Sequence, residues 1–285
     1  MNFDLEAFLD RYQFLLMVAV LVPLLVLETY RPLAPGRRGR LVHGLRNAGV
    51  FLLGSVVFGF VLVLSAKAAE LTNARHFGLF HLLSLSTPAR VVLGLLAIDF
   101  MHYGRHFLMH KVPLFWRLHR VHHSDPDVDA TSLFRIHPLE NLTVFVCQGV
   151  LAVLLGIPPL ALLLHSVLNT ASAMVQHSNV RMPAWADRWM SLMLTSPGMH
   201  RVHHSRHVEE TDTNYGPIFS CWDRLFGTYL RPPEDRRIEL GLAEFDAPQY
   251  QSLRGMLVTP FITPEALLPV KPAPVAPRRV IVPVR

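Results

Sequence analysis

The sequence predicts an all-α integral membrane protein of about four to five transmembrane or hairpin helices, with a cage of histidines on the cytoplasmic side. Three observations support this prediction. Of the 285 residues, 51% are hydrophobic and only 17% are charged, whereas a soluble domain carries about 25% charged residues. The apolar residues gather in runs that approach the roughly 20 residues of a membrane-spanning helix. The pattern His-x-x-His-His occurs twice, at 119–123 and 200–204, close to the ends of such runs.

The first apolar run covers residues 14–27 and predicts a span that is retained in the mature protein. Acidic residues precede it, whereas a signal peptide has a basic flank. A second span is expected at about 47–68. Between the two lies a basic loop at 31–46, which the positive-inside rule places in the cytoplasm. The net charge of +6 is thus explained by the flanks of the spans, and no nucleic-acid partner is indicated.

A third span at about 89–108 returns to the cytoplasmic side, and residues 141–156 and 158–177 form an apolar hairpin. Its turn is Gly-Ile-Pro-Pro at 156–159, because two prolines cannot continue a helix interior. The arms are short, so the hairpin either crosses the membrane fully or only enters it. In both cases it begins and ends on the cytoplasmic side, which brings the histidine patterns to one face.

Two further segments complete the chain. Residues 181–195 contain Trp185 and Trp189 with few charges, which favours an interfacial helix, with a plain core helix as the alternative. From Pro260 onward there are seven prolines in 26 residues, which predicts a mostly irregular tail. We therefore expect membrane spans with a basic loop at 1–88, a histidine-rich domain at 89–232 and a proline-rich tail at 233–285.

Three histidine boxes have the spacing of metal ligands. On a helix, positions i, i+3 and i+4 share one face, while adjacent residues point about 100° apart, so two adjacent histidines can serve two different ions. Imidazole is the commonest neutral metal ligand near pH 7, but it suits iron, zinc and copper alike. So many imidazoles in one place would hold more than one ion. The predicted ligands are His106, His110, His119, His122, His123, His200, His203 and His204, with His177 at the end of the hairpin.

Four other residues are candidates for the metal site or its surroundings: His102, His137, Asp99 and Asn214. An ionisable side chain inside a span, such as His102, is a functional candidate, although a hydrogen-bonded interior histidine is the alternative. Asp99 should have a partner, for which His102 and Arg105 are nearest along the chain. Metal-bound histidines donate their other N–H to a carboxylate or carbonyl. The acids available for this are Asp125, Asp127, Asp129, Glu140, Asp212 and Asp223.

Five segments resemble the fatty acid hydroxylase / sterol desaturase superfamily of membrane di-iron proteins. They are DFMHYGRHFLMHKVPLFWRLHRVHHSD at 99–125, RIHPLE at 135–140, QHSN at 176–179, HRVHHS at 200–205 and TNYGPIFSCWDRLFGTY at 213–229. The order of the boxes, their spacing and their flanking residues agree over about 90–230, nearly half of the chain. Aligned to that pattern, the first box is His106 and His110, and His102 falls outside it.

The resemblance implies a cytoplasmic-side pair of iron ions, O₂ as co-substrate, and hydroxylation or desaturation of a membrane lipid such as a sterol or a fatty acyl chain. Each turnover needs two external electrons, and the chain has no iron–sulfur, dinucleotide or haem motif. A separate reductase, ferredoxin or cytochrome must therefore dock, with the basic loop at 31–46 as a candidate contact. The topology suits a bacterial inner membrane or the endoplasmic reticulum.

Two other classes of protein stay open. A zinc-dependent membrane hydrolase would use the same histidines, but the chain lacks the His-Glu-x-x-His pattern that supplies a general base. A non-catalytic membrane protein that binds metal or lipid, either a transporter or a scaffold, is the second. A transporter should carry polar residues through several spans, and the first two spans have almost none. A scaffold would be expected to lose box histidines, and none of the eight is missing.

Overall fold

The computed structural model describes residues 4–34, 39–233 and 237–263, which form helices joined by turns. The helices are α1 (Leu5–Tyr30), α2 (Arg40–Ala74), α3 (Leu79–Leu82), α4 (Thr87–Lys111), α5 (Pro113–His123), α6 (Glu140–Leu155), α7 (Pro159–His177), α8 (Ala184–Met190), α9 (Pro197–His203), α10 (Val208–Thr211), α11 (Cys221–Phe226) and α12 (Leu253–Val258). Three short 3₁₀ turns accompany them, η1 (Ser132–Phe134), η2 (Ala243–Phe245) and η3 (Thr259–Phe261). Within the described residues there are three isolated β-bridges and no strand.

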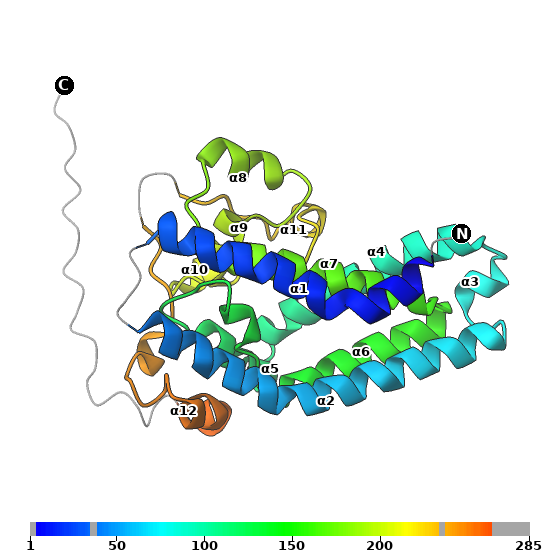
Figure 1. The fold of residues 1–285 in the computed structure, drawn as a ribbon, viewed down its shortest axis with the longest axis horizontal. Helices are drawn as coiled ribbons and strands as arrows, with labels where there is room; N and C mark the ends of the chain where they lie inside the picture. Colours follow the sequence, from blue (N-terminus) through cyan, green and yellow to red (C-terminus); the bar gives the residue numbers. More distant parts are fainter. Residues whose placement is uncertain (1–3, 35–38, 234–236, 264–285) are drawn as a thin grey trace.

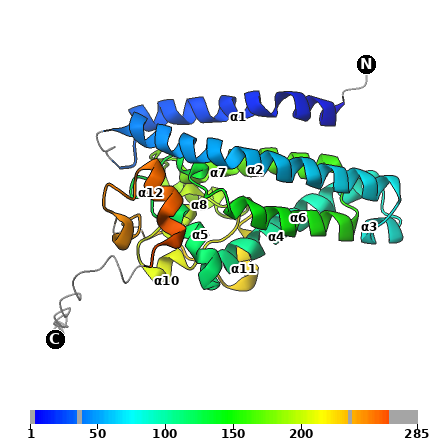
Figure 2. The same cartoon turned by 90° about the horizontal axis from the view of Figure 1, so that it is seen from below.

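The long helices α1, α2, α4, α6 and α7 run side by side along the longest axis of the molecule (Figure 1). Helix α2 packs against α6, α1 packs against α7, and α4 contacts both α6 and α7. The view from below shows α1 as the outermost of these helices (Figure 2). Helices α5, α9, α10 and α12 lie toward one end of the bundle, and α3 lies at the other (Figure 1). The bundle thus has two chemically different ends.

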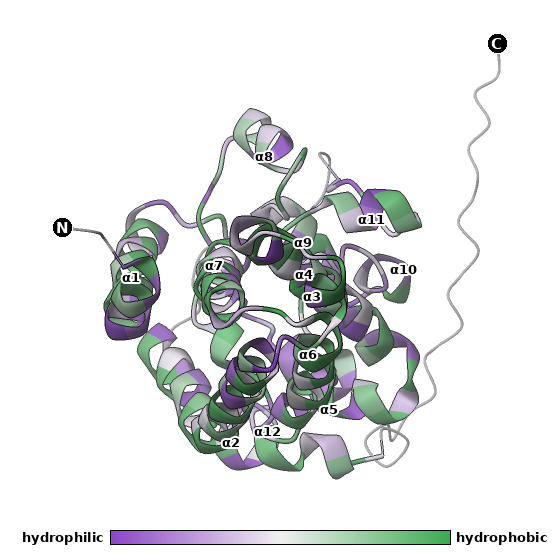
Figure 3. Ribbon diagram, turned by 90° about the vertical axis from the view of Figure 1, so that its right-hand side faces the viewer, coloured by the Kyte–Doolittle hydropathy of each residue, from purple (hydrophilic) through white to green (hydrophobic). Residues whose placement is uncertain are grey.

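Two segments have the length and hydropathy of membrane-crossing helices. They are α1 and Arg40–Leu82, the segment that contains α2 and α3. Only 6% of the apolar window of the first and 19% of that of the second is buried, whereas the core helix of a soluble protein is mostly buried. Their apolar residues cover much of the outside of the bundle (Figure 3). No other helix in the described ranges passes the same test, so the predicted count of four to five crossings stays a prediction.

The predicted hairpin is present as α6, a turn and α7. Gly156 ends α6 in the left-handed region, with φ +71°, and Pro159 is the first residue of α7, where a helix tolerates proline. The turn is packed against Gly78, whose φ is +104°, and a Cβ on Gly78 would lie 2.4 Å from the backbone nitrogen of Gly156.

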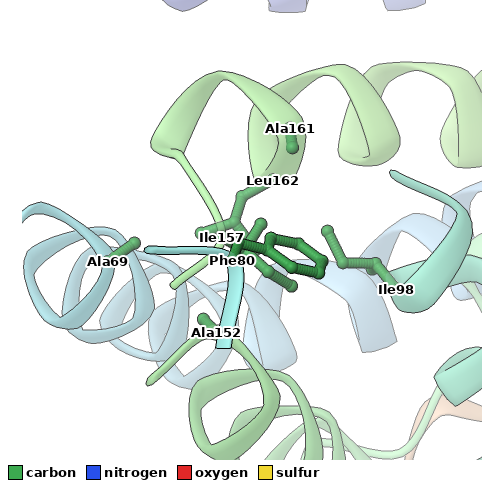
Figure 4. Close-up of a cluster of buried hydrophobic side chains, with 7 residues drawn as sticks. All are labelled: Ala69, Phe80, Ile98, Ala152, Ile157, Ala161 and Leu162. Carbon is green, nitrogen blue, oxygen red and sulfur yellow. The ribbon is translucent and has the colours of Figure 1, made fainter. Parts of the chain in front are cut away.

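A cluster of apolar side chains surrounds this turn and joins α2, α3, α4, α6 and α7 at the end of the bundle away from the histidine boxes (Figure 4). Its buried members are Ala69, Phe80, Ile98, Ala152, Ile157, Ala161 and Leu162. Each buried aliphatic or aromatic side chain of this kind contributes about 1.5–3 kcal/mol relative to an exposed one. The cluster therefore ties the helices together at the end opposite the boxes.

The segment between the first two helices differs from the prediction. The expected loop at 31–46 is wrong in its second half, because α2 already begins at Arg40. The Arg40 guanidinium pairs with the buried Glu28 carboxylate of α1 and lies 3.8 Å from an Asp129 carboxylate oxygen. Residues 35–38 of the predicted loop lie outside the described residues. The arginine is therefore held in the fold, and the turn between the two helices is short.

The segment predicted to be an interfacial helix contains a short helix, α8, which covers only Ala184–Met190. Trp185 and Trp189 are 68% and 70% exposed, which excludes the alternative of a core helix.

The region after residue 237 is more ordered than the predicted tail, because α12 packs on α2 and η3 packs on α5. Arg120 of α5 donates hydrogen bonds to the carbonyls of Thr259 and Ile262. Residues 264–285 of the predicted tail lie outside the described part.

Candidate metal centre

Four helices bring their histidines to one end of the bundle. His106 and His110 lie on the last turns of α4, the 119–123 box ends α5, His177 is the last residue of α7, and the 200–204 box lies on α9 and its C-cap. Both short helices begin with a proline in the first turn, and Ser196 caps α9 by accepting from the Met199 N–H. These starts set the helical register, which places each box on one helix face.

The nine predicted histidines form two separate groups. One group has ring nitrogens from α4, α5 and α9, and the other from α5, α7 and α9, with the ligand atoms of each group within 4.8 Å of one another. His122 and His123 point into different groups, as do His203 and His204. This is the divergence expected of adjacent helical residues. The first group is His106, His110, His119, His123 and His203, and the second is His122, His177, His200 and His204.

The rings are oriented by hydrogen bonds at Nδ1. His106 Nδ1 lies 3.0 Å from the Tyr215 carbonyl, His177 Nδ1 lies 2.7 Å from the Ala173 carbonyl, and His203 Nδ1 lies 2.7 Å from the Thr213 carbonyl. Because a carbonyl can only accept, these Nδ1 atoms must carry the hydrogen. The Nε2 atoms are then left with bare lone pairs, which is the form that binds a metal.

These lone pairs face one another. His177 Nε2 lies 3.0 Å from Nε2 of both His122 and His200, and 3.2 Å from His204 Nε2. In the first group, His106 Nε2 lies 3.1 Å from His119 Nε2. Several acceptors converging at such distances repel one another unless a cation lies between them. The donor set therefore fits a metal ion in each group.

Burial supports the same interpretation. Within the described residues, buried ring nitrogens without a hydrogen-bond partner include Nε2 of His123 and His203 and both nitrogens of His110. An unpaired buried polar atom costs about 1–3 kcal/mol, so such a concentration indicates a missing partner. Burial, with smaller contributions from neighbouring imidazoles, lowers the pKa of His123 and His203 well below the usual value of 6.5. These rings are therefore neutral at pH 7 and available as ligands.

Two of the six candidate acids contact the groups. The Glu140 carboxylate lies 3.0 Å from His119 Nδ1 and 3.4 Å from the Arg105 guanidinium. Asp212 lies 3.3 Å from His110 Nδ1 and accepts from the Lys111 ammonium at 2.6 Å. The other four have different contacts: Asp125 and Asp129 pair with His43, the Asp127 N–H donates to Asp125, and Asp223 accepts from the backbone of Tyr215 and Gly216.

The four weaker candidates lie outside both groups. His102 stacks on His165, with ring centroids 4.9 Å apart, and His137 accepts from the Leu139 N–H at the start of α6. The Asn214 amide bonds to backbone carbonyls of Met199 and Leu230 and fastens a turn. These contacts assign His137 and Asn214 to the scaffold.

The expected partner of Asp99 was wrong. Its carboxylate is buried and lies 3.3 Å from His165 Nε2, and it accepts from Trp222 Nε1 at 2.8 Å and from the Phe219 N–H at 3.3 Å. His102 and Arg105 are nearer along the chain, but neither is its hydrogen-bond partner among the described residues. The tertiary packing of α4 on α7 and α11 supplies partners that are 66 to 123 residues away in sequence.

Tyr215 was not anticipated. Its ring packs edge-on against His106, His110 and His203 at centroid distances of 5.1–5.6 Å, and its buried hydroxyl has no hydrogen-bond partner among the described residues. It lies in the TNYG sequence of the resemblance, but no spacing rule singles out a tyrosine there. Only the fold brings residue 215 back over the end of α4.

A cavity of about 280 Å³ opens onto both groups. His106 and His119 of the first group and His122, His177 and His200 of the second lie in its wall. Its other walls come from α1, α2, α4, α6 and α7 and include Met17, Phe51, Leu62, Leu133, Phe134 and Leu162. The volume is at the lower end of the range of small-molecule sites, roughly 300–1,000 Å³. It therefore suits a segment of a long molecule.

Comparison with known proteins identifies the region that carries these residues. Residues 91–228 match the model of the fatty acid hydroxylase family. Among curated relatives, ornithine lipid hydroxylase of Rhizobium tropici is 31% identical over 153 residues, which is 54% of this chain and 45% of that protein. Alkylglycerol monooxygenase of Homo sapiens is 29% identical over 180 residues, 62% of this chain and 39% of that protein. Cholesterol 25-hydroxylase of Rattus norvegicus is 28% identical over 236 residues, which is 77% of this chain and 75% of that protein.

The chain thus spans less than half the length of the first two relatives. No solved structure matches it. The family match covers α4 through α11, which carry all nine grouped histidines as well as Glu140 and Tyr215. Residues 91–228, which carry the histidine boxes, thus match the fatty acid hydroxylase family, and the relatives of this chain are hydroxylases and monooxygenases.

Proposed function

We propose that this protein is a membrane di-iron oxygenase that hydroxylates a lipid. The observation that carries the proposal is the pair of histidine groups, five and four imidazoles, that open onto one cavity. Zinc sites close at four ligands, or use three with a water, so nine imidazoles exceed one such site. The named activities of the relatives, which act on an ornithine lipid, an alkylglycerol and cholesterol, agree with a lipid substrate.

Two iron ions bound by the groups would supply the O₂ activation that an unactivated C–H bond requires and that no side chain can provide. In a hydroxylation, one oxygen atom enters the C–H bond, and the other leaves as water after two electrons and two protons are added. The grouped histidines of this chain would hold the ions, and Glu140 orients His119 through Nδ1. The aliphatic cavity wall positions a substrate segment and excludes water.

We propose a multi-pass topology with the site on the cytoplasmic side. The turn between α1 and α2 and the end of α7 lie at the same end of the bundle, since the Leu33 N–H donates to the Asn179 carbonyl and the Arg181 N–H donates to the Arg31 carbonyl. The basic residues near this turn would lie in the cytoplasm by the positive-inside rule. The exposed apolar sides of α1 and α2 would face lipid.

The electrons must come from a separate donor, and we propose that an acidic protein delivers them at a basic cleft beside α9. This cleft of about 1,220 Å³ is lined by five arginines and two acids. Arg201 lies in the cleft and directly follows His200 of the second group. Burial and the nearby Arg237 guanidinium lower the pKa of Arg201 to about 10, so Arg201 stays positive at neutral pH and attracts an anionic surface. The arginines are Arg188, Arg201, Arg206, Arg231 and Arg237.

The first test is the metal content of protein purified in detergent from iron-supplied cells, with Mössbauer spectroscopy of ⁵⁷Fe-labelled material. About two irons per chain are expected. His122→Ala and His203→Ala remove a ligand from different groups, so each should lower the iron content toward one per chain. His207→Ala removes an exposed histidine outside both groups and serves as the matched control.

Other outcomes would favour the remaining classes. Zinc alone, with hydrolytic activity, would replace the oxygenase with the hydrolase. Protein with all nine histidines intact and no bound metal would indicate a non-catalytic lipid-binding protein. Iron that is equally abundant in wild type and in both group variants would contradict the assignment of these histidines as ligands.

A further inference from the structure

A second set of polar side chains, separate from the histidine groups, lines the cavity. His102 of α4 and His165 of α7 stack on each other with an interplanar angle of 17°, and both lie in the cavity wall. His102 is hydrogen-bonded to Gln148 of α6, which also lines the cavity. Asn169, one turn along α7 from His165, lines it as well. Neither histidine belongs to a metal group, so the proposed chemistry leaves them unused.

Asp99 determines which nitrogen of His165 is free. The carboxylate accepts from Trp222 Nε1 at 2.8 Å, and its other oxygen lies 3.3 Å from His165 Nε2. Because a carboxylate only accepts, Nε2 carries the hydrogen, and in that tautomer Nδ1 is the ring nitrogen with the lone pair. No hydrogen bond from another described residue reaches this Nδ1. The wall of the cavity therefore offers a hydrogen-bond acceptor at His165, beside the amide groups of Gln148 and Asn169.

Binding a purely apolar ligand against this wall would carry a free-energy cost, because the polar groups of the wall would lose water. A hydroxyl or amide that loses water without gaining a partner costs about 1–3 kcal/mol in proteins, and ionisable groups within membrane segments are rare unless they are functional. A hydrocarbon segment alone would leave His165 Nδ1 without a hydrogen-bond partner. A ligand that carries a hydroxyl beside its hydrocarbon part would donate to His165 Nδ1 and pack on the aliphatic wall.

The position along α4 relates this set to the reacting carbon. His102 precedes His106 of the first group by four residues, which is about 6 Å along a helix. A hydroxyl held at the His102 and His165 pair would thus fix the distance between itself and the carbon that faces the metal groups. The small cavity volume of about 280 Å³ limits sliding of the segment.

We propose that His102 and His165 form a hydroxyl-binding subsite that selects lipids with an alcohol group and sets which carbon is presented to the histidine groups. This inference rests on the proposed oxygenase function for its consequence, but the binding itself can be measured without turnover. His165 receives the O–H, Asp99 holds the His165 tautomer, and the His102–Gln148 pair forms the adjoining wall.

The test is competition binding with radiolabelled hexadecanol on the purified, metal-loaded protein in a zwitterionic detergent. Unlabelled hexadecanol and its methyl ether share the chain and differ in the O–H donor. Wild type should bind the alcohol about three- to tenfold more tightly, the range expected for one net hydrogen bond. His165→Phe should abolish this preference with unchanged iron content. Thr170→Val is the matched control, because Thr170 lines the same cavity but its hydroxyl already donates to the Ser166 carbonyl.

Equal competition by alcohol and ether in wild type, or a preference that survives in His165→Phe, would overturn the subsite. If His165→Phe does not fold, Gln148→Leu removes the hydrogen-bond partner of His102 and should weaken the same preference. An alcohol preference in a protein that holds no iron and performs no oxygenation would leave the subsite standing while the proposed function fails. The two inferences therefore fail in different measurements.

Discussion

At the scale of single residues, the adjacent histidines decide how the centre is divided. His122 and His123 are neighbours in sequence, yet their rings enter different groups because successive helical residues point about 100° apart. His203 and His204 do the same. For His106, His119, His177 and His203, the neighbouring residues decide which nitrogen is free. Backbone carbonyls of residues 173, 213 and 215 and the Glu140 carboxylate occupy Nδ1 and turn Nε2 toward the centre.

Glu140 is the residue whose effect on the ligands can be measured directly. Glu140→Gln keeps the size of the side chain but removes the charge that holds His119 and Arg105. We expect the affinity for iron to fall by about 10–100-fold, the usual effect of losing a partner of a metal-bound histidine. The measurement is iron retention against a graded concentration of chelator. Asp246→Asn, at an exposed carboxylate paired with Arg206, is the control, and equal retention in both variants would contradict the role of Glu140.

At the scale of elements, the hairpin turn and the loop before α3 depend on each other. Gly78 and Gly156 both have positive φ, and their backbones touch. This close contact between the two backbones holds α3 and the α6–α7 turn together beside the apolar cluster of Figure 4. A side chain at either glycine would separate the elements that align α4 and α7, two of the four helices that carry the grouped histidines.

Gly78→Ala should therefore destabilise the protein by at least about 2 kcal/mol, from strain at a positive φ together with a backbone clash. The measurement is the temperature at which half of the monodisperse protein in detergent is lost on heating. Gly59→Ala is the matched control, since a Cβ there meets nothing within 4 Å and alanine favours the helix. If both variants melt together, the contact between Gly78 and Gly156 does not limit stability.

At the scale of the whole molecule, the two ends of the bundle have different tasks. The apolar cluster lies at one end, and at the other lie the histidine groups, the turn between α1 and α2, and the basic cleft beside α9. The cavity lies between the long helices and opens onto the histidines from within. A lipid and an electron donor would therefore reach the centre from different directions.

The basic cleft makes a prediction about electron transfer that depends on this arrangement. Arg237→Glu should slow the oxidation of a reduced, acidic [2Fe–2S] ferredoxin by the iron-loaded protein about tenfold at low ionic strength. The slowing should fade in high salt, because long-range attraction is screened. Stopped-flow absorbance of the ferredoxin measures the rate. Arg75→Glu makes the same charge change at the α3 end, and equal slowing in the two variants would exclude the cleft as the docking site.

Part of this protein is determined by local sequence. The apolar runs at 14–27, 47–68 and 141–177 predict helices because a backbone in an apolar environment must pair its own N–H and C=O groups, and Gly156 with two prolines ends α6 before α7 begins. Eight of the nine grouped histidines were predicted from their spacing, since helical periodicity places each box on a shared face, and His177 was predicted from its place at the end of the hairpin. Whether they bind iron stays a prediction.

Other features were decided only by tertiary structure. The start of α2 at Arg40 depends on Glu28 of a different helix, and the partner of Asp99 is His165 rather than the nearby His102 or Arg105. The place of Tyr215 and the cavity wall likewise arise where α4, α6 and α7 meet. Hydrogen bonds of buried charges are chosen by proximity in space, which sequence spacing reports only within one helix. Contacts between helices follow from packing, and packing brings together residues more than sixty positions apart.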